Sequence, residues 1–458
     1  MDSFEKYNHF FFVGIAGTGM SAIAQYLNGV GKKVSGSDRL FNPDSKMQIQ
    51  EQFEREGITC FFQDASGVNE DIDVLVISTA IEESNIELQK ARKLHIPVMK
   101  RSELLSSISK EKRTIAVGGT SGKSTTTAMI FHIMQICGYE PSVMNGAGLS
   151  SLQRKGLPGN AWVGKSDWLV IESDESDGSI VNYVPEYAVL LNIDRDHKEY
   201  EELITLFKIF RSNTRNKFIV NQGHSLASQL SQDKLYDFGE NISGIGFSGS
   251  NFRQEGFSIF FECNKVKFKI PAIGRHNMEN ALAAIAVCNV IGISEEKCAY
   301  ALQTYDGIYR RTQLVGETKG IIVIDDFAHN PVEVSCAIQA CQSIGARVFA
   351  WFQPHGYGPL KFMHKDLEED VLSVLRSGDV FLLSDVYYVG GTVNRDITSE
   401  GVATEMQQKN SQVKYYSDRN DLKLYLKQEC REGDVILIMG ARDTTLSEFA
   451  LEIFNSLA

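Results

Sequence analysis

The sequence predicts an α/β protein built from three domains. The chain has 458 residues, and a domain usually spans about 100–200 residues. Short apolar segments typical of buried strands alternate with helical patterns in three successive series. Hydrophobic residues make up 43% of the chain and charged residues 23%, as in globular proteins with several cores. We expect domains at residues 1–108, 109–311 and 312–458.

The first series predicts a parallel sheet that begins with a glycine turn. An apolar strand runs into the turn, an amphipathic helix follows, and further strands and a charged helix complete the series. This strand–helix–strand order is typical of nucleotide-binding sheets. The expected strands are residues 9–14, 33–37, 74–78 and 96–99, and the expected helices are residues 20–30 and 86–94.

A polar link at residues 109–113 leads into the second series, which contains a β-rich insert, and the third series follows it. The second series has expected strands at residues 114–117, 168–172 and 187–191, the insert at 239–270 and a helix at 277–291. The third has expected strands at residues 320–324, 346–350, 379–383 and 434–438.

Charge and cysteine content exclude several function classes. Lys and Arg number 46 against 58 Asp and Glu, a net charge of −12, whereas nucleic-acid binding needs a basic footprint. No segment reaches the ~20 apolar residues of a membrane helix, and the first residues do not resemble a signal peptide. Eight cysteines without a C-x-x-C pair indicate reduced thiols. We expect a cytoplasmic monomer or homodimer without nucleic-acid or membrane partners.

A phosphate-binding loop is predicted at residues 119–125, G-T-S-G-K-S-T, between a strand and a helical pattern. Glycines in this position let backbone N–H groups surround phosphate oxygens. Lys123 supplies a positive charge for the outer phosphates, and the Ser124 hydroxyl suits a magnesium shell. The spacing is one residue shorter than G-x-x-x-x-G-K-S/T, so a plain glycine-rich turn is the alternative. We expect a nucleoside triphosphate with Mg²⁺.

Acidic side chains and a histidine follow the next two strands of this series. Residues 172–177, E-S-D-E-S-D, follow one strand, and residues 192–197 end in His197 after the other. The carboxyl ends of parallel strands share one edge of a sheet, where ligands collect, and Mg²⁺ prefers oxygen ligands. Taken alone, the acidic segment is more often a solvated loop, and the Asp-His pair is more often a surface turn. Their place downstream of the phosphate loop favours a metal site.

With these motifs in place, the chain resembles the Mur ligase family, whose members form amide bonds with ATP in peptidoglycan assembly. The likeness extends through all three domains. Residues 14–21, G-I-A-G-T-G-M-S, and 36–38, G-S-D, are similar to the family's UDP-sugar loop and acidic position. By residue type alone this turn suits NAD equally. The implied UDP-sugar-binding residues are Gly17, Thr18, Gly19, Met20, Ser21 and Asp38.

The resemblance also implies an ATP site. Ser121 stands where alanine-adding members commonly have His, and residues 274–280, G-R-H-N-M-E-N, match the segment near adenine. The two asparagines of that segment could equally cap and line a helix. The implied ATP-binding residues are Gly119, Thr120, Ser121, Gly122, Lys123, Ser124, Thr125, His276, Asn277, Asn280, Arg311 and Asp326, and the implied metal ligands are Ser124, Glu172 and His197.

Two further family motifs lie at the junction of the second and third domains and within the third. Arg310–Arg311 resembles the family's pair that joins the central and last domains, in which Arg311 reaches an ATP phosphate once the domains close; a solvated basic turn is the alternative. Residues 325–331, D-D-F-A-H-N-P, resemble D-Y-A-H-x-P, with Asp326 facing the nucleotide and Phe327 replacing Tyr. The implied catalytic residues are Lys123, Glu172, His197, Arg311 and His329.

One motif departs from the family pattern. Residues 352–355, F-Q-P-H, match the alanine-adding members, but G-Y-G-P at 356–359 replaces R-Y-S/T-R. The two missing arginines could clamp the carboxylate of the acceptor, and Lys361 is a candidate to replace part of their charge.

For the fold, the resemblance implies Rossmann-like N- and C-terminal domains around a central P-loop ATPase-type domain with a small β insert. For the activity, it implies an ATP- and Mg²⁺-dependent ligase that joins the carboxylate of UDP-N-acetylmuramate to L-alanine through an acyl phosphate. Two alternatives stay open. One is a recycling ligase that joins L-alanyl-γ-D-glutamyl-meso-diaminopimelate to the same sugar, and the other is a nucleotide sensor without catalysis.

Overall fold

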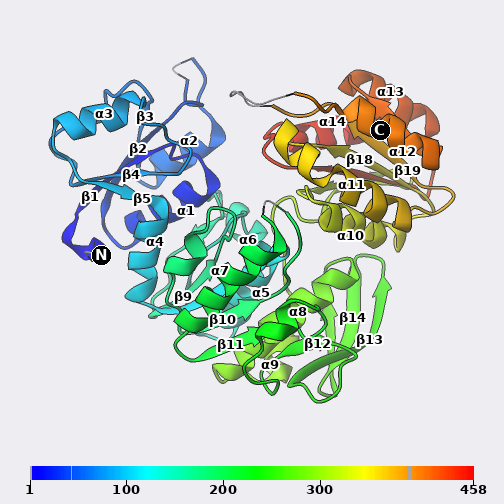
Figure 1. Cartoon of the computed structure of the whole chain (residues 1–458), viewed down its shortest axis with the longest axis horizontal. Helices are drawn as coiled ribbons and strands as arrows, with labels where there is room; N and C mark the ends of the chain where they lie inside the picture. Colours follow the sequence, from blue (N-terminus) through cyan, green and yellow to red (C-terminus); the bar gives the residue numbers. More distant parts are fainter. Residues whose placement is uncertain (1–2, 43, 197, 389–394, 458) are drawn as a thin grey trace. The chain divides into compact units, whose positions relative to one another are not determined.

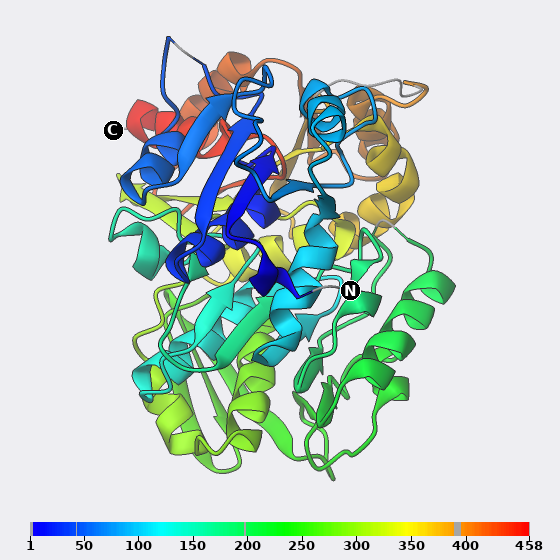
Figure 2. The same ribbon diagram turned by 90° about the vertical axis from the view of Figure 1, so that its left-hand side faces the viewer.

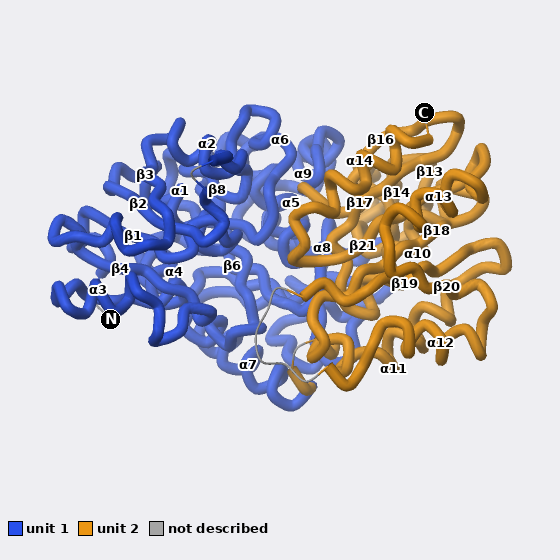
Figure 3. The backbone as a smooth tube through the Cα atoms, turned by 90° about the horizontal axis from the view of Figure 1, so that it is seen from above, with its two compact units in different colours: residues 1–193, 200–249, 279–308 blue, residues 194–199, 250–278, 309–458 orange. Residues whose placement is uncertain are grey.

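The computed structural model of the chain describes residues 3–42, 44–196, 198–388 and 395–457, which form four β-sheets and the helices around them (Figure 1). These elements fall into two compact units. Unit 1 comprises residues 1–193, 200–249 and 279–308, and unit 2 comprises the remainder of the chain (Figure 3).

The N-terminal sheet of unit 1 has five parallel strands in the order β3-β2-β1-β4-β5. Its deep-blue strands β1 and β2 lie side by side in Figure 2. Because the chain leaves β1 for β2 on one side and later adds β4 on the other, the glycine turn after β1 lies at the topological switch point, where such sheets bind ligands. The elements are η1 (Phe4–Lys6), β1 (His9–Val13), α1 (Thr18–Gly29), β2 (Lys33–Asp38), α2 (Gln48–Arg55), β3 (Thr59–Phe62), β4 (Val74–Ile77), α3 (Ile86–Lys93), β5 (Val98–Lys100) and α4 (Arg101–Lys110).

The central sheet has six strands in the order β11-β10-β6-β9-β7-β8, so the phosphate loop after β6 also lies at a switch point. One apolar cluster is shared with the N-terminal sheet and joins Phe12 to Ile171 and Phe207. The elements are β6 (Arg113–Gly118), α5 (Lys123–Ile136), β7 (Ser142–Met144), α6 (Ser150–Gln153), β8 (Ala161–Trp162), β9 (Trp168–Glu172), η2 (Ser179–Asn182), β10 (Tyr187–Leu190), α7 (Tyr200–Asn213), β11 (Lys217–Val220), η3 (Ala227–Leu230), α8 (Arg275–Val290) and α9 (Glu295–Leu302).

The expected β-rich insert is confirmed as a four-stranded sheet in the order β12-β13-β14-β15. The C-terminal sheet of unit 2 has the order β16-β17-β21-β18-β19-β20, and β16 is antiparallel to β17. Its two faces each carry an apolar cluster. The elements are β12 (Phe238–Glu240), β13 (Phe247–Glu255), β14 (Ser258–Cys263), β15 (Val266–Ile270), β16 (Gln313–Thr318), β17 (Ile321–Asp326), α10 (Pro331–Gln342), β18 (Val348–Gln353), α11 (Tyr357–Val374), β19 (Val380–Ser384), α12 (Ser399–Lys409), β20 (Val413–Tyr416), α13 (Arg419–Glu429), β21 (Val435–Gly440) and α14 (Leu446–Leu457).

Each strand that an apolar segment predicted is present, and its ends lie within a few residues of the expected ones. The polar link at residues 109–113 is wrong in extent, because α4 continues through Lys110 and β6 begins at Arg113. Ser109 is buried there and donates a hydrogen bond to the carbonyl of Ser106. The structure joins none of the eight cysteines in a disulfide bond. Within the described parts of the chain, no helix has the length and apolar character needed to span a bilayer.

A buried carboxyl in the N-terminal sheet predicts a pH-dependent stability. Glu87 has no exposed surface and accepts a hydrogen bond from the Ser37 hydroxyl at 2.6 Å. Burial raises the pKa of Glu87 to about 7, although the Ser37 hydrogen bond lowers it. Between pH 4.5, its ordinary pKa, and about 7, the folded state keeps a proton that the unfolded state releases. We therefore expect this carboxyl to reduce the free energy of unfolding as pH rises through that range.

The test compares wild type with Glu87→Gln, whose side chain does not titrate. Between pH 5 and pH 8 the stability of wild type relative to the variant should fall by about 1–3 kcal/mol, measured by urea unfolding. A constant offset between the two proteins across that range would contradict the prediction.

Candidate active site

The phosphate loop occupies the turn between β6 and α5. Gly119 has φ +140°, and a Cβ on it would lie 3.0 Å from the Cβ of Leu191, so the turn requires glycine here. Gly122 is left-handed, with φ +83°, and precedes the first residue of α5 without a side-chain cap. The first N–H groups of a helix attract anions. The loop geometry therefore suits a phosphate group.

Asn192 holds this loop from the end of the neighbouring strand β10. Its Oδ1 accepts hydrogen bonds from the Thr120 hydroxyl at 2.9 Å and from the Ser121 N–H at 2.8 Å. Its Nδ2 donates to the Ser121 carbonyl at 3.1 Å. The sequence analysis missed this role of Asn192. The available signal was its position as a polar residue just after a buried strand of the same sheet.

We expect Asn192→Ala to weaken ATP binding by about 10- to 100-fold, because it removes three hydrogen bonds of about 0.5–1.5 kcal/mol each that shape the loop. Isothermal titration with ATP and Mg²⁺ measures the change. An unchanged dissociation constant in a variant with the thermal stability of wild type would show that Asn192 does not shape the phosphate site.

Lys123 lies among carboxylates at the same edge of the sheet. Its Nζ donates to the carbonyls of Gly119 at 2.7 Å and Thr120 at 3.1 Å and forms an ion pair with Glu175 at 3.0 Å. Burial lowers the pKa of Lys123, but Glu175, Asp174 and Glu172 together raise it above its ordinary value. The ammonium therefore stays charged.

Glu175 is the most deeply buried partner of this lysine. Burial raises the pKa of Glu175 to about 7; the charge of Lys123 lowers it only in part, and the neighbouring Asp174 carboxylate raises it further. Glu175 belongs to the acidic segment that the sequence indicated, but its contact with Lys123 was not predicted.

Two of the three predicted metal ligands lie together. The Ser124 hydroxyl donates to Oε2 of Glu172 at 2.7 Å, and the Gly146 N–H donates to the same oxygen at 2.7 Å. A hydroxyl and a carboxylate beside a phosphate loop are the oxygen donors that Mg²⁺ prefers. The third ligand, His197, lies outside the residues that the structure describes. Among the described residues, no group of three or more His, Cys, Asp or Glu side chains is arranged to hold a metal.

The predicted UDP-sugar turn is held by the end of β2. The N–H groups of Gly14 and Ile15 donate to the Ser37 carbonyl at 2.8 and 2.9 Å. Both carboxylate oxygens of Asp38 accept backbone hydrogen bonds, one from Ala16 at 3.0 Å and one from Leu40 at 3.0 Å. Asp38 is therefore part of the turn itself.

The side chains of Met20 and Ser21, also predicted to bind the sugar nucleotide, are buried in unit 1. The Ser21 hydroxyl donates to the Thr18 carbonyl at 2.9 Å. Their backbone belongs to the first turn of α1, whereas Gly17 is its N-cap and has no side-chain cap. This part of the turn therefore offers mainly backbone N–H groups to a ligand.

The two asparagines of residues 274–280 differ in what they contact. Asn277 donates to the Ile273 carbonyl at 2.8 Å, a local contact at the start of α8. Asn280 accepts a hydrogen bond from the Thr126 hydroxyl at 3.3 Å, and a Cβ on Gly122 would lie 2.4 Å from its Oδ1. In unit 1 Asn280 thus lies directly against the phosphate loop.

In unit 2 the paired arginines have different environments. Arg310 is 5% exposed, forms an ion pair with Asp325 at 2.9 Å and donates to the carbonyl of Gly440 at 2.8 Å. Arg311 is more exposed, and its Nη1 lies 3.9 Å from the carboxylate of Glu333. The alternative of a solvated basic turn is therefore wrong for Arg310, which is a buried structural residue.

Asp326 is anchored at the end of β17. Its two oxygens accept hydrogen bonds from the N–H groups of Thr312 at 2.5 Å and Ala328 at 2.7 Å. Burial raises the pKa of Asp326 to about 6, although Arg311 lowers it. The carboxylate shapes the chain around Arg311.

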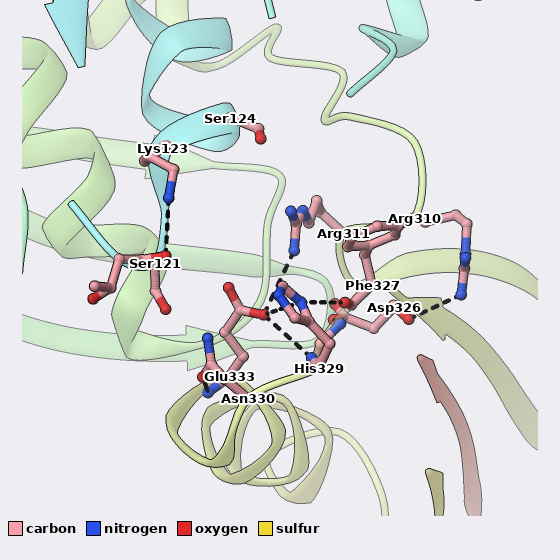
Figure 4. A network of polar contacts seen from close by, with 12 residues as sticks. Ser121, Lys123, Ser124, Arg310, Arg311, Asp326, Phe327, His329, Asn330 and Glu333 are labelled. Atoms are coloured by element: carbon pink, nitrogen blue, oxygen red, sulfur yellow. Dashed lines mark hydrogen bonds and ion pairs between the residues drawn. The ribbon is translucent and has the colours of Figure 1, made fainter. Parts of the chain in front are cut away.

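Glu333 connects the polar groups of unit 2 and was missed by the sequence analysis. Its carboxylate forms an ion pair with Nδ1 of His329 at 3.0 Å and lies near Arg311 (Figure 4). Burial lowers the pKa of His329, but Glu333 raises it above its ordinary value. His276, by contrast, has a pKa lowered to about 4 by burial, with Glu333 raising it and Arg311 lowering it. The signal for Glu333 was its place four residues after His329, in the first turn of α10.

Lys361, the candidate to replace the missing arginines, forms an ion pair with Asp396, so its charge already has a partner. A second cation lies close by. The guanidinium of Arg395 is 5.4 Å from the ring centre of Tyr357 and 4.8 Å from that of Tyr388. Sequence comparison with the R-Y-S/T-R pattern does not reveal Arg395, because it lies 36 residues after Pro359. His355 is buried, with its ring 5.2 Å from that of His329.

Three family models match consecutive parts of the chain. The catalytic domain of the Mur ligase family matches residues 9–113, the Mur ligase middle domain matches 117–288, and the Mur ligase glutamate ligase domain matches 310–442. The chain is 34% identical over 450 residues to a UDP-N-acetylmuramate–L-alanine ligase from Syntrophomonas wolfei, covering 94% of each protein. It is 31% identical over 462 residues to a protein of the same name from Chelativorans, covering 96% of each.

Solved structures show the same fold. A UDP-N-acetylmuramate-alanine ligase from Thermotoga maritima has a TM-score of 0.80 and 24% identity, covering 98% of this chain and 100% of that one. A murein peptide ligase from Psychrobacter arcticus has a TM-score of 0.69 and 20% identity, covering 98% of each. The predicted three-domain α/β fold is confirmed. The sequence relatives and the three consecutive family models establish that the chain belongs to the Mur ligase family.

Proposed function

We propose that the protein is an ATP-dependent ligase that joins the carboxylate of UDP-N-acetylmuramate to L-alanine in peptidoglycan precursor synthesis. The observation that carries this proposal is the phosphate loop of unit 1, where Lys123 lies among acidic side chains and Ser124 meets Glu172. It occurs in a chain similar over 94–96% of its length to proteins named for this reaction.

The proposed division of labour follows the three domains. Residues 1–108 bind the sugar nucleotide, residues 109–311 bind ATP, and residues 312–458 bind the acceptor. The first assignment is supported by the glycine turn and the second by the phosphate loop. The third is supported by the ion pair of His329 with Glu333. We place the reaction in the cytoplasm, where its proposed nucleotide substrates are available, and expect a monomer or homodimer.

In the first proposed step, a carboxylate oxygen of the sugar attacks the γ-phosphorus of ATP, and the bond from that phosphorus to the β-bridging oxygen breaks. The products are an acyl phosphate and ADP. Charge develops on the phosphoryl oxygens, so nearby cations lower the barrier. Lys123 is the charged group of unit 1 for this purpose, and Arg311 is the one that unit 2 supplies.

In the second proposed step, the neutral amine of L-alanine attacks the acyl carbon. The tetrahedral intermediate collapses, the carbon–oxygen bond to the phosphate breaks, and the amide and inorganic phosphate form. The amine must lose a proton on the way. His329, held by Glu333 at 3.0 Å, is the proposed group that orients and receives it.

Ser124 and Glu172 are the described residues that would hold Mg²⁺, with His197 as the further candidate. A bound Mg²⁺ supplies Lewis-acid stabilisation of phosphate charge. The side chains already meet at 2.7 Å, so this part of the site needs no large rearrangement to present its oxygens.

The test measures phosphate release with UDP-N-acetylmuramate, ATP and Mg²⁺ while the acceptor is varied among L-alanine, glycine, L-serine and the L-alanyl-γ-D-glutamyl-meso-diaminopimelate tripeptide. We expect release that depends on both the sugar and an amine and is fastest with L-alanine. Preference for the tripeptide would instead favour the recycling reaction, for which the missing R-Y-S/T-R arginines are the specific observation. Release without dependence on sugar or amine would contradict both.

A further inference from the structure

The acidic loop, residues 172–177, contacts both nucleotide sites proposed for unit 1. At one end it meets the phosphate loop, through Glu172 with Ser124 at 2.7 Å and Glu175 with Lys123 at 3.0 Å. At the other end, Oδ2 of Asp177 accepts a hydrogen bond from Nη2 of Arg101 at 2.7 Å. Both contacts thus arise within one segment of six residues.

Arg101 lies directly against the glycine turn. It is the first residue of α4, and its side chain is only 19% exposed. A Cβ on Gly19 would lie 2.9 Å from Nη1 of Arg101 and 3.3 Å from its Cδ. The guanidinium therefore touches the turn on one side and the acidic loop on the other.

Asp177 is held by a second hydrogen bond besides its contact with Arg101. Its second oxygen accepts a hydrogen bond from the Ser179 N–H at 2.9 Å, at the start of η2. Asp174, in the same loop, accepts one from the Ser176 N–H at 3.0 Å. These short-range bonds give the loop a defined conformation between its two ends.

A second set of hydrogen bonds also connects the glycine turn with the phosphate loop. The Asn160 amide donates to the Thr18 carbonyl at 2.8 Å and to the Ser21 hydroxyl at 2.7 Å. The Asn145 N–H donates to the Asn160 carbonyl at 2.9 Å, and the adjacent Gly146 N–H donates to Glu172 at 2.7 Å. The turn and the phosphate loop are thus joined twice within unit 1.

We propose that Arg101 is a positioning residue that couples occupancy of the glycine turn by the sugar nucleotide to binding of ATP at the phosphate loop. This inference rests on the proposed function. The diphosphate of a UDP-sugar is anionic and competes with Asp177 for the guanidinium beside Gly19. A weaker Arg101–Asp177 contact loosens the acidic loop, and Lys123 exchanges Glu175 for the phosphates of ATP.

The predicted coupling is positive and reciprocal, because each ligand must change the affinity of the other by the same factor. Arg101 itself needs no contact with ATP for this effect. If Arg101 had a purely structural role, its replacement would lower the stability, or would lower the affinity for ATP equally with and without the sugar nucleotide. The coupling factor, which is the ratio of those two ATP affinities, therefore separates a positioning role from a structural one.

The test uses isothermal titration of the full chain with the non-hydrolysable analogue AMP-PNP and Mg²⁺, with and without saturating UDP-N-acetylmuramate. In wild type we expect the sugar to tighten analogue binding by at least about fivefold. In Arg101→Gln, and independently in Asp177→Asn, the factor should fall below about twofold. Asp177→Asn keeps the arginine and provides the test if Arg101→Gln does not fold.

Arg113→Ala is the matched control. Arg113 also pairs with a carboxylate, that of Glu186 at 3.0 Å, but it begins β6 at the end opposite the phosphate loop. It should keep the coupling of wild type. Equal coupling in Arg101→Gln and wild type, or independent binding of the two ligands to wild type, would overturn the inference. Failure of wild type to bind either ligand would instead overturn the proposed function.

Discussion

Replacement of Lys123 by alanine is expected to reduce ATP-dependent phosphate release by at least about 10³-fold, because the ammonium stabilises charge that develops on the transferred phosphoryl group. In the structure the Nζ atom is placed by the carbonyls of Gly119 and Thr120 and by Glu175, and the nearby carboxylates raise its pKa. A coupled assay with the sugar, ATP, Mg²⁺ and L-alanine measures the loss.

Lys165→Ala is the control for this prediction. Lys165 belongs to the same unit and forms an ion pair with Glu140 at 3.0 Å, but its side chain is 84% exposed. It should keep wild-type turnover. Turnover within about tenfold of wild type in Lys123→Ala would remove Lys123 from the proposed phosphoryl transfer.

Arg310→Met is expected to destabilise unit 2 by about 3–5 kcal/mol, because it leaves the carboxylate of Asp325 buried without its cation. The two side chains are only 6% and 2% exposed and lie 2.9 Å apart. Burial raises the pKa of Asp325, and Arg310 opposes that rise. Hydrogen exchange of the β17 amides measures the loss within unit 2.

The exposed pair Arg253–Glu255, also in unit 2, provides the comparison. Arg253→Met should cost no more than about 1 kcal/mol, since exposed ion pairs contribute little. Asp325→Asn should recover part of the loss in Arg310→Met by removing the uncompensated charge. Equal effects of the two arginine substitutions would contradict the distinction between a buried and an exposed pair.

The sequence was sufficient for the central strands of the three large sheets and for the glycine-rich turn between β6 and α5, because buried strands and glycine turns leave strong local patterns. It missed β7 and β8, which have only three and two residues and so carry no periodicity. It also missed four strands at sheet edges, β3, β11, β16 and β20. The residues of β3 are exposed or half-buried.

Partners across the fold were the main omission in the site. Asn192 meets the phosphate loop, 71 residues earlier in the chain, only after folding. The two adjacent arginines show the same limit, because Arg310 is buried whereas Arg311 is only half-buried. Arg310 turns inward with a left-handed φ of +54°, and no residue pattern indicated that turn.

Transfer of ¹⁸O tests the central claim, activation of the sugar carboxylate by ATP, most directly. UDP-N-acetylmuramate labelled with ¹⁸O in both carboxylate oxygens is turned over with ATP, Mg²⁺ and L-alanine, and the released phosphate is analysed by mass spectrometry. An acyl phosphate requires each phosphate to carry one ¹⁸O, because the attacking carboxylate oxygen leaves with phosphorus. Amide formed together with unlabelled phosphate would contradict the account.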